Sequence, residues 1–116
     1  MDAFEELRKD LRAFVDERDW DQFHAPKDLA VGLAVEAGEL LEHFQWRDPG
    51  ADEVRADAKT LSEIRDEVAD CFLYAILVAD KLGFDVLAAA HAKLAKNRAK
   101  YPVEKARGNP KKYTEH

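Results

Sequence analysis

The sequence predicts an all-α protein, a bundle of four main helices whose core is completed by oligomerisation. Apolar residues recur at spacings of three and four along most of the chain, and strong start and stop signals separate these segments. No segment alternates with a period of two under β-branched enrichment. The 116 residues suffice for a single domain, expected over residues 1–102, with an irregular basic tail over 103–116.

The first predicted helix covers about 15 residues, because apolar positions at residues 4–15 form one stripe and Asp2 is placed as its N-cap. A loop follows. The second helix is expected over about residues 27–46, since Pro26 suits the first turn of a helix. The Asp-Pro-Gly sequence at 48–50 then ends it.

A polar connection leads to the third predicted helix, which opens with a capping box formed by Thr60 and Glu63. This helix runs to Gly83, a natural residue just past a helix C-terminus. Asp85 caps the fourth helix, which closes at Tyr101 before a proline.

Composition narrows the function classes. With 47% hydrophobic and 36% charged residues, an intrinsically disordered chain is excluded. Residues 93–112 hold eight Lys or Arg and one acid, whereas the rest of the chain is acidic, which opposes broad polynucleotide binding. The longest apolar run, 71–79, is too short to cross a membrane. A single cysteine indicates a reduced cytoplasm.

Two predicted helices are too apolar for a monomer. Few polar residues interrupt 29–41, and 71–79 is apolar around its whole circumference. A helix without a polar face has to be covered on all sides, and four helices of this length cannot easily surround two such segments. We therefore expect a homo-oligomer in which subunits share the core.

Two pairs of carboxylates interrupt these apolar helices. Glu36 with Glu39, and Glu67 with Asp70, are each spaced three residues apart and so share a helix face. Like charges at this spacing repel each other, and burying them without a counter-charge costs several kcal/mol more. A positive group is therefore expected between the two pairs.

The positive group could be a metal ion or a basic side chain. Alternatively, the four acids could lie exposed on a solvated helix face, where no positive group is needed. The flanking residues are apolar, and neither 28–46 nor 66–80 contains a Lys or Arg, which favours a bound metal. Ligands made only of carboxylate oxygens suit Mg²⁺, with Mn²⁺ as a substitute. His43, one turn beyond Glu39, is expected to point to solvent rather than to bind the metal.

A magnesium site in an acidic bundle points to phosphate chemistry, because Mg²⁺ is typically held by a few carboxylates together with substrate phosphates. Further cations are available on the fourth predicted helix at Lys93, Lys96, Arg98 and Lys100, although these also fit a solvated helix face. Neither Ser62 nor Cys71 has a plausible base partner, so a water molecule is the expected nucleophile.

The two carboxylate pairs occur together with RDWDQFHAPKDLA at 18–30, FQW at 44–46, NRAKYP at 97–102 and KYT at 112–114. In these segments the sequence resembles the MazG-like all-α nucleoside triphosphate pyrophosphohydrolases, and within them the dCTP pyrophosphatase branch. The resemblance extends over most of the chain. It implies hydrolysis of a nucleoside triphosphate to the monophosphate and pyrophosphate by a homotetramer, in a house-cleaning role.

The resemblance also implies roles for individual residues. Glu36, Glu39, Glu67 and Asp70 would be the catalytic Mg²⁺ ligands. The implied substrate contacts are Trp20, Asp21, Gln22, Phe23, His24, Trp46, Tyr74, Lys93 and Asn97. Stacking on the base suits both tryptophans, as does burial at a subunit interface.

One departure from the branch concerns the base. Its members can carry a histidine in the first helix that touches the base, whereas residues 11–14 read Leu-Arg-Ala-Phe here. The expected substrate is therefore dCTP, a modified dCTP or another pyrimidine deoxynucleotide. The alternative from another class is a non-catalytic oligomeric regulator that binds a partner or nucleic acid through the basic segment.

Overall fold

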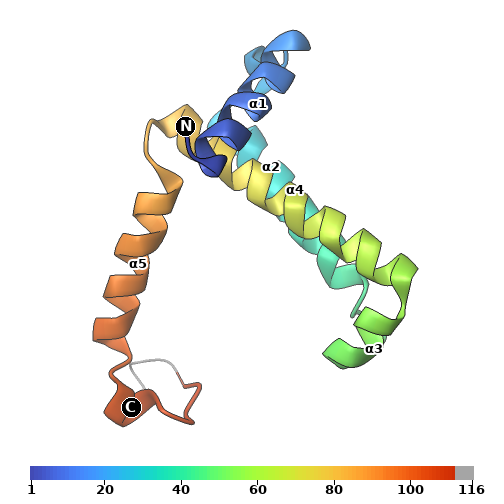
Figure 1. Ribbon diagram of the computed structural model, residues 1–116, viewed down its shortest axis with the longest axis vertical. Helices are drawn as coiled ribbons and strands as arrows, with labels where there is room; N and C mark the ends of the chain where they lie inside the picture. Colours follow the sequence, from blue (N-terminus) through green and yellow to red (C-terminus); the bar gives the residue numbers. More distant parts are fainter. Residues whose placement is uncertain (112–116) are drawn as a thin grey trace. The chain divides into compact units, whose positions relative to one another are not determined.

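The computed structural model describes residues 1–111, and its regular elements are all helical (Figure 1). They are α1 (Ala3–Glu17), the short 3₁₀ helix η1 (Asp21–Phe23), α2 (Pro26–Glu42), α3 (Ala51–Ala56), α4 (Ala58–Leu82), α5 (Val86–Lys100) and α6 (Val103–Ala106). No strand occurs within residues 1–111, so the predicted all-α class is confirmed. Within the same residues, no helix is both long and apolar enough to span a membrane.

The chain divides into two compact units, of which the first spans Met1–Gly83 and the second begins at Phe84. α1, α2, α3 and α4 belong to the first unit, and α5 and α6 to the second. Packing of the four main helices into one bundle stays a prediction, as does a domain boundary after residue 102.

In the first unit, α2 and α4 run side by side in opposite directions (Figure 1). α1 contacts α4 through the rings of Phe4 and Phe72, whose centroids are 6.3 Å apart. A second contact joins Arg8 to Asp80, 3.1 Å apart. The buried apolar residues are Leu11, Val15, Leu29, Ile76, Leu77 and Ala79. The core therefore lies where α1, the start of α2 and the end of α4 meet.

The predicted ends of three helices are confirmed. The carboxylate of Asp2 accepts a hydrogen bond from the Glu5 amide at 2.8 Å, which caps α1. Asp85 caps α5 in the same way. Gly83 closes α4 with a φ of 79°, a left-handed conformation that glycine adopts without a steric penalty.

The second predicted helix is four residues too long. α2 ends at Glu42, and residues 43–46 form turns and a bend instead of helix. The amides of His43 and Phe44 donate to carbonyls three residues back, at 3.3 and 2.9 Å. This tightening from four-residue to three-residue spacing ends a helix without a glycine or proline.

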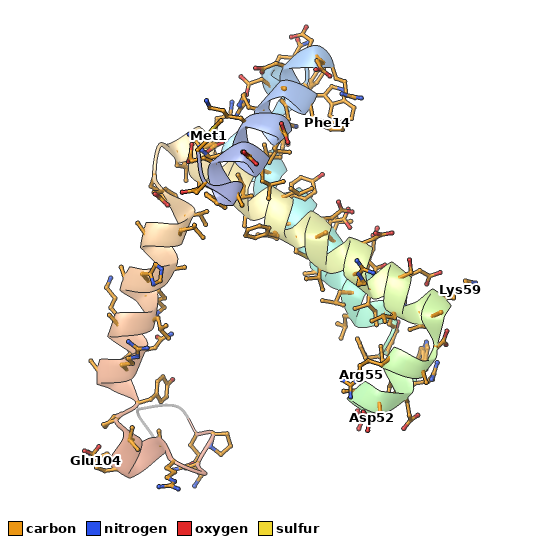
Figure 2. The ribbon with its side chains drawn as sticks, in the orientation of Figure 1. Met1, Phe14, Asp52, Arg55, Lys59 and Glu104 are labelled. Atoms are coloured by element: carbon orange, nitrogen blue, oxygen red, sulfur yellow. The ribbon has the colours of Figure 1, made fainter. Side chains whose placement is uncertain are left out.

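The predicted polar connection contains the short helix α3, which carries the ion pair of Asp52 and Arg55 (Figure 2). The predicted capping box at Thr60 is also wrong, because α4 begins at Ala58 with Asp57 as its N-cap. The Asp57 carboxylate accepts from the Thr60 amide at 3.2 Å and from its hydroxyl at 2.8 Å. Thr60 thus lies inside the helix and supports the cap of another residue.

The second unit carries α5, whose predicted end at Tyr101 is confirmed. Lys93 and Asn97 lie one turn apart on this helix. The tail was expected to be irregular, yet α6 follows directly after Pro102. Proline fixes a backbone angle compatible with the start of a helix, which explains a short helix at this point. The KYT segment at 112–114 lies outside the described residues.

Candidate active site

The paired carboxylates come from two neighbouring helices, Glu36 and Glu39 from α2, and Glu67 and Asp70 from α4. The pKa of Glu36 is raised above its ordinary value, chiefly by burial and then by a hydrogen bond with Glu39. The negative charges of Glu39, Asp70 and Glu67 raise it further. The four groups therefore share one electrostatic environment.

Two oxygens in this cluster lack hydrogen-bond partners although they are buried: Oε2 of Glu36 and Oε2 of Glu67. Glu67 Oε2 does lie 2.7 Å from Nε2 of His43, although this contact lacks hydrogen-bond alignment. The His43 side chain is only 16% exposed, so its predicted orientation towards solvent is wrong. The buried Glu36 oxygen, which has no hydrogen-bond donor, favours binding of a cation.

The carboxylates are near one another without forming a closed metal cage. Within residues 1–111, no three His, Cys, Asp or Glu side chains lie close enough to hold one metal ion. Glu39 and Asp70 are exposed residues at the edge of the cluster. The ligand roles of the four carboxylates thus stay predictions, and binding would require these side chains to move closer together.

A pocket of about 220 Å³ adjoins the carboxylates. It is lined by Leu11, Phe14, Val15, Trp20, His24, Glu36, Asp70, Leu73, Tyr74 and Leu77. Two carboxylates and an imidazole therefore share the pocket with three aromatic rings and four aliphatic side chains. Clefts for whole drug-sized ligands measure roughly 300–1,000 Å³, so this pocket suits one part of a larger ligand.

The loop between α1 and α2 forms part of this pocket and is anchored on Phe14, a residue near the end of α1 (Figure 2). The Trp20 ring meets the Phe14 ring edge-on, with centroids 5.5 Å apart. The Arg18 guanidinium lies 3.9 Å from the centre of the Phe14 ring. Phe14 thus fixes the position of Trp20 at the pocket.

The remaining predicted contacts in this loop lie outside the pocket lining. The Asp21 carboxylate pairs with Lys81 and Arg12, both at 3.1 Å, and these partners hold its pKa below the ordinary value. The Gln22 amide donates to the backbone and side chain of Asp19. Phe23 is exposed. Of the predicted loop residues, the structure therefore brings Trp20 and His24 to the pocket.

Three predicted substrate contacts lie elsewhere in the structure. Trp46 stands in the bend after α2 and is 87% exposed. Lys93 and Asn97 belong to α5 in the second unit. Tyr74, in contrast, lines the pocket beside Asp70, as their spacing of one helical turn predicts.

The contribution of α1 to the pocket was not predicted from the sequence. Leu11, Phe14 and Val15 were expected to serve the apolar core; Leu11 and Val15 are buried there, and all three also line the cavity. A signal for this wall lay in the resemblance, which implies a base-contacting residue in the first helix at residues 11–14. Here apolar side chains form that wall.

Known proteins match this chain over most of its length. The model of the MazG-like family matches residues 31–115. The chain is 36% identical to dCTP pyrophosphatase 1 of Rattus norvegicus over 114 residues, covering 97% of this chain and 67% of the relative. Its identity to dCTP pyrophosphatase 1 of Homo sapiens is 35% over the same length and coverage.

A solved pyrophosphatase from Archaeoglobus fulgidus has a similar fold, with a TM-score of 0.79 and 36% sequence identity. The match covers 88% of this chain and 94% of that one. The resemblance noted in the sequence is thereby confirmed, and a non-catalytic regulator is no longer needed to explain the chain. The protein belongs to the MazG-like family and is an enzyme of the nucleoside triphosphate pyrophosphohydrolase class.

Proposed function

We propose that this protein hydrolyses dCTP, or a modified dCTP, to the nucleoside monophosphate and pyrophosphate. The observation that carries the proposal is a pocket in which Glu36 and Asp70 adjoin an aromatic cage that includes Trp20 and Tyr74. Such a pocket combines carboxylates suited to metal and phosphate chemistry with aromatic rings on which a base can stack. Two relatives named dCTP pyrophosphatase 1 support the choice of base.

The cofactor that fits the cluster is Mg²⁺, with Mn²⁺ as a substitute. Its ligands would be Glu36, Glu39, Glu67 and Asp70, whose oxygen donors suit a hard cation. Support comes from the buried oxygens of Glu36 and Glu67 that accept no hydrogen bond, of which the Glu36 oxygen would gain a partner in a bound cation. A bound Mg²⁺ neutralises phosphate charge and lowers the pKa of a coordinated water.

The chain's own residues bind and orient the substrate. Phe14 and Trp20, whose rings pack edge-on against each other, offer aromatic surface to a base, while Tyr74 lines the pocket together with Asp70. A carboxylate of the cluster accepts a proton from the water that attacks the α-phosphorus, while the bond from this phosphorus to the α–β bridging oxygen breaks and pyrophosphate leaves. No protein nucleophile is required, because the attacking water supplies the oxygen that enters the nucleoside monophosphate.

The pocket wall on α1 bears on which base is preferred. Leu11 and Phe14 present apolar surface where an imidazole would otherwise meet the base. An apolar wall favours a base with an added apolar group, because it offers no hydrogen bond to polar edges. A cytosine with a small apolar substituent is therefore included in the proposal alongside cytosine itself.

We also propose that the enzyme is a homotetramer located in the cytoplasm. Val31, Val35 and Leu41 on α2 are each more than half exposed in the single chain, as is Val68 on α4. Covering such faces with further subunits would remove apolar surface from water. The free thiol of Cys71, which is half-buried, is compatible with a reducing compartment.

The test is a turnover assay with a panel of ribo- and deoxynucleoside triphosphates, including 5-methyl-dCTP, at several Mg²⁺ concentrations. We expect the two cytosine deoxynucleotides to be the best substrates, with no turnover in EDTA until Mg²⁺ is added back. In ¹⁸O-labelled water the label should enter the nucleoside monophosphate, while the pyrophosphate stays unlabelled. Orthophosphate as the first product would contradict attack at the α-phosphorus.

A further inference from the structure

Gly32 stands in the interior of α2, directly against the ring of Tyr74 on α4. A Cβ atom added at Gly32 would lie 2.4 Å from Cε1 and 2.6 Å from Cζ of that ring. Contacts below 3.0 Å are not tolerated, so the ring would have to move. Gly38 of the same helix differs, because a Cβ atom added there meets no heavy atom within 4 Å.

Backbone conformation does not explain a glycine at this position. Gly32 lies in regular α-helix, where alanine is the better helix former. The reason for glycine is therefore steric, since its bare backbone lets a neighbouring ring approach more closely than any side chain would allow.

Gly32 and Tyr74 form a layer next to the carboxylate cluster. Gly32 precedes Glu36 by one turn on α2, and Tyr74 follows Asp70 by one turn on α4. Because the two helices run in opposite directions (Figure 1), Gly32 is displaced from Glu36 in the same direction as Tyr74 is from Asp70, by about 6 Å along the helix axes. The Gly32 layer therefore lies about one turn from the proposed site of the metal and phosphates.

The Tyr74 ring borders both Gly32 and the pocket. Tyr74 belongs to the pocket lining, whereas Gly32 does not. A side chain at position 32 would push the ring away from α2 and into the 220 Å³ space that it borders. The width of the pocket at this layer thus depends on the absence of a side chain at Gly32.

We propose that Gly32 is a specificity-determining residue, which holds the Tyr74 ring against α2 and so keeps the pocket wide enough for a nucleobase. The inference rests on the proposed function insofar as it takes the base of a nucleotide to be the occupant. Gly32 acts through Tyr74 and is a positioning residue. Its effect falls on binding of the base, because the carboxylates one turn away keep their places.

The experiment compares Gly32→Ala with the parent on whichever nucleoside triphosphate the parent turns over best. We expect KM to rise by about 10-fold or more, with kcat within about threefold of the parent. Binding of the corresponding nucleoside monophosphate, measured by calorimetry without Mg²⁺, should weaken to a similar degree. Using the parent's best substrate separates the two proposals. If the parent prefers another base, the proposal that dCTP is the substrate fails, whereas the proposed role of Gly32 can still be tested.

Two further variants distinguish ring displacement from a general effect of the substitution. Gly38→Ala adds the same methyl group to the same helix in open space, so it should raise the melting temperature and leave monophosphate binding unchanged. In a Tyr74→Leu background, Gly32→Ala should change monophosphate binding less than twofold and should also raise the melting temperature. A Gly32→Ala enzyme with the parent's KM and binding would overturn the inference, as would an equal loss of binding with and without the Tyr74 ring.

Discussion

At the scale of single residues, Glu36 is where folding and activity conflict. Its pKa is raised by burial, by Glu39 and by the charges of Asp70 and Glu67, so its ionised form costs the metal-free protein stability. A charge that weakens the fold is retained where it serves another purpose. In this enzyme, that purpose is the proposed cation site.

The first prediction is that Glu36→Gln stabilises the metal-free protein and inactivates it. Because the folded pKa is raised, the destabilisation grows as pH rises above the unfolded value near 4.5 and disappears as pH falls below it. The melting temperature in EDTA should therefore rise by a few degrees at pH 7, with little gain near pH 4.5. Mg²⁺-dependent turnover should fall by about 100-fold or more.

Glu42→Gln is the matched control, since it removes an exposed charge from the same helix outside the carboxylate cluster. Its turnover should equal that of the parent. The conservative changes Glu39→Gln, Glu67→Gln and Asp70→Asn should lose activity as Glu36→Gln does. Near-native turnover in three of these four cluster variants would contradict the metal-site proposal.

Whereas Glu36 is a buried charge, Trp46 is a large aromatic side chain that is 87% exposed in the single chain. The second prediction is that Trp46→Ala raises KM for the preferred deoxynucleotide by about 5- to 100-fold, equivalent to about 1–3 kcal/mol of stacking. Metal binding, measured by Mg²⁺-dependent shifts in melting temperature, should not change. An unchanged KM would assign Trp46 a structural role and leave Trp20 and His24 as the residues that meet the base.

At the scale of elements, ion pairs tie the loop before α2 to its neighbours. Asp21 of η1 bridges Arg12 of α1 and Lys81 of α4, both at 3.1 Å. This loop also carries Trp20 and His24, which line the pocket. The bridge thus sets where the aromatic wall of the pocket stands relative to α1 and α4.

The third prediction concerns the double variant Arg12→Gln and Lys81→Gln. Exposed ion pairs contribute little to stability, so the melting temperature should stay close to that of the parent. KM should rise about 2- to 10-fold because the loop loses its tether, and the KM of the variant should depend less on salt concentration. Steady-state kinetics between about 50 and 500 mM salt would measure both effects.

Arg55→Gln is the control for this variant, because it breaks the exposed pair with Asp52 on α3, away from the pocket lining (Figure 2). Its KM should match that of the parent at every salt concentration. If the double variant also kept the parent's KM and salt dependence, Asp21 would have no part in positioning the loop.

At the scale of the whole molecule, much apolar surface of the single chain faces solvent. Val31 and Val35 of α2 are each 52% exposed, and Val68 and Phe72 of α4 are 51% and 43% exposed. In contrast, Ile76 is fully buried within the chain. Substitutions at the exposed apolar residues therefore test assembly, whereas a substitution at Ile76 tests folding.

The fourth prediction is that light scattering measures a mass above that of one 13.2 kDa chain, with a tetramer as the expected state. Val31→Asp should lower that mass while helicity by circular dichroism persists, because an exposed position tolerates a charge in the single chain. Ile76→Asp should abolish folding, since a charge buried without a partner costs several kcal/mol. A stable parent monomer at micromolar concentration would contradict the proposed assembly.

Local signals in the sequence predicted local structure well. Asp2, Gly83 and Asp85 mark helix ends because a cap depends on bonds within one turn of the chain. The errors are of the same local kind. Asp57 competes with Thr60 for one helix start, and α3 is too short to display an apolar period.

For the candidate site, the spacing of the carboxylates was enough to predict a common face and, from its apolar flanks, a cation. Helical geometry alone determines which side chains share a face, so this inference needed no tertiary structure. The family could also be predicted from the sequence, because the similarity to its members extends over most of the chain.

The tertiary structure alone decided which distant residues meet. Gly32 touches Tyr74, Asp21 pairs with Lys81, and His43 approaches Glu67. Each contact joins residues many turns apart in sequence, so it depends on the register of α2 and of the loop before it against α4 and on the closeness of their packing. Helical periodicity specifies the direction of a side chain around its own axis, whereas register and approach are set by the shapes of the two packed surfaces.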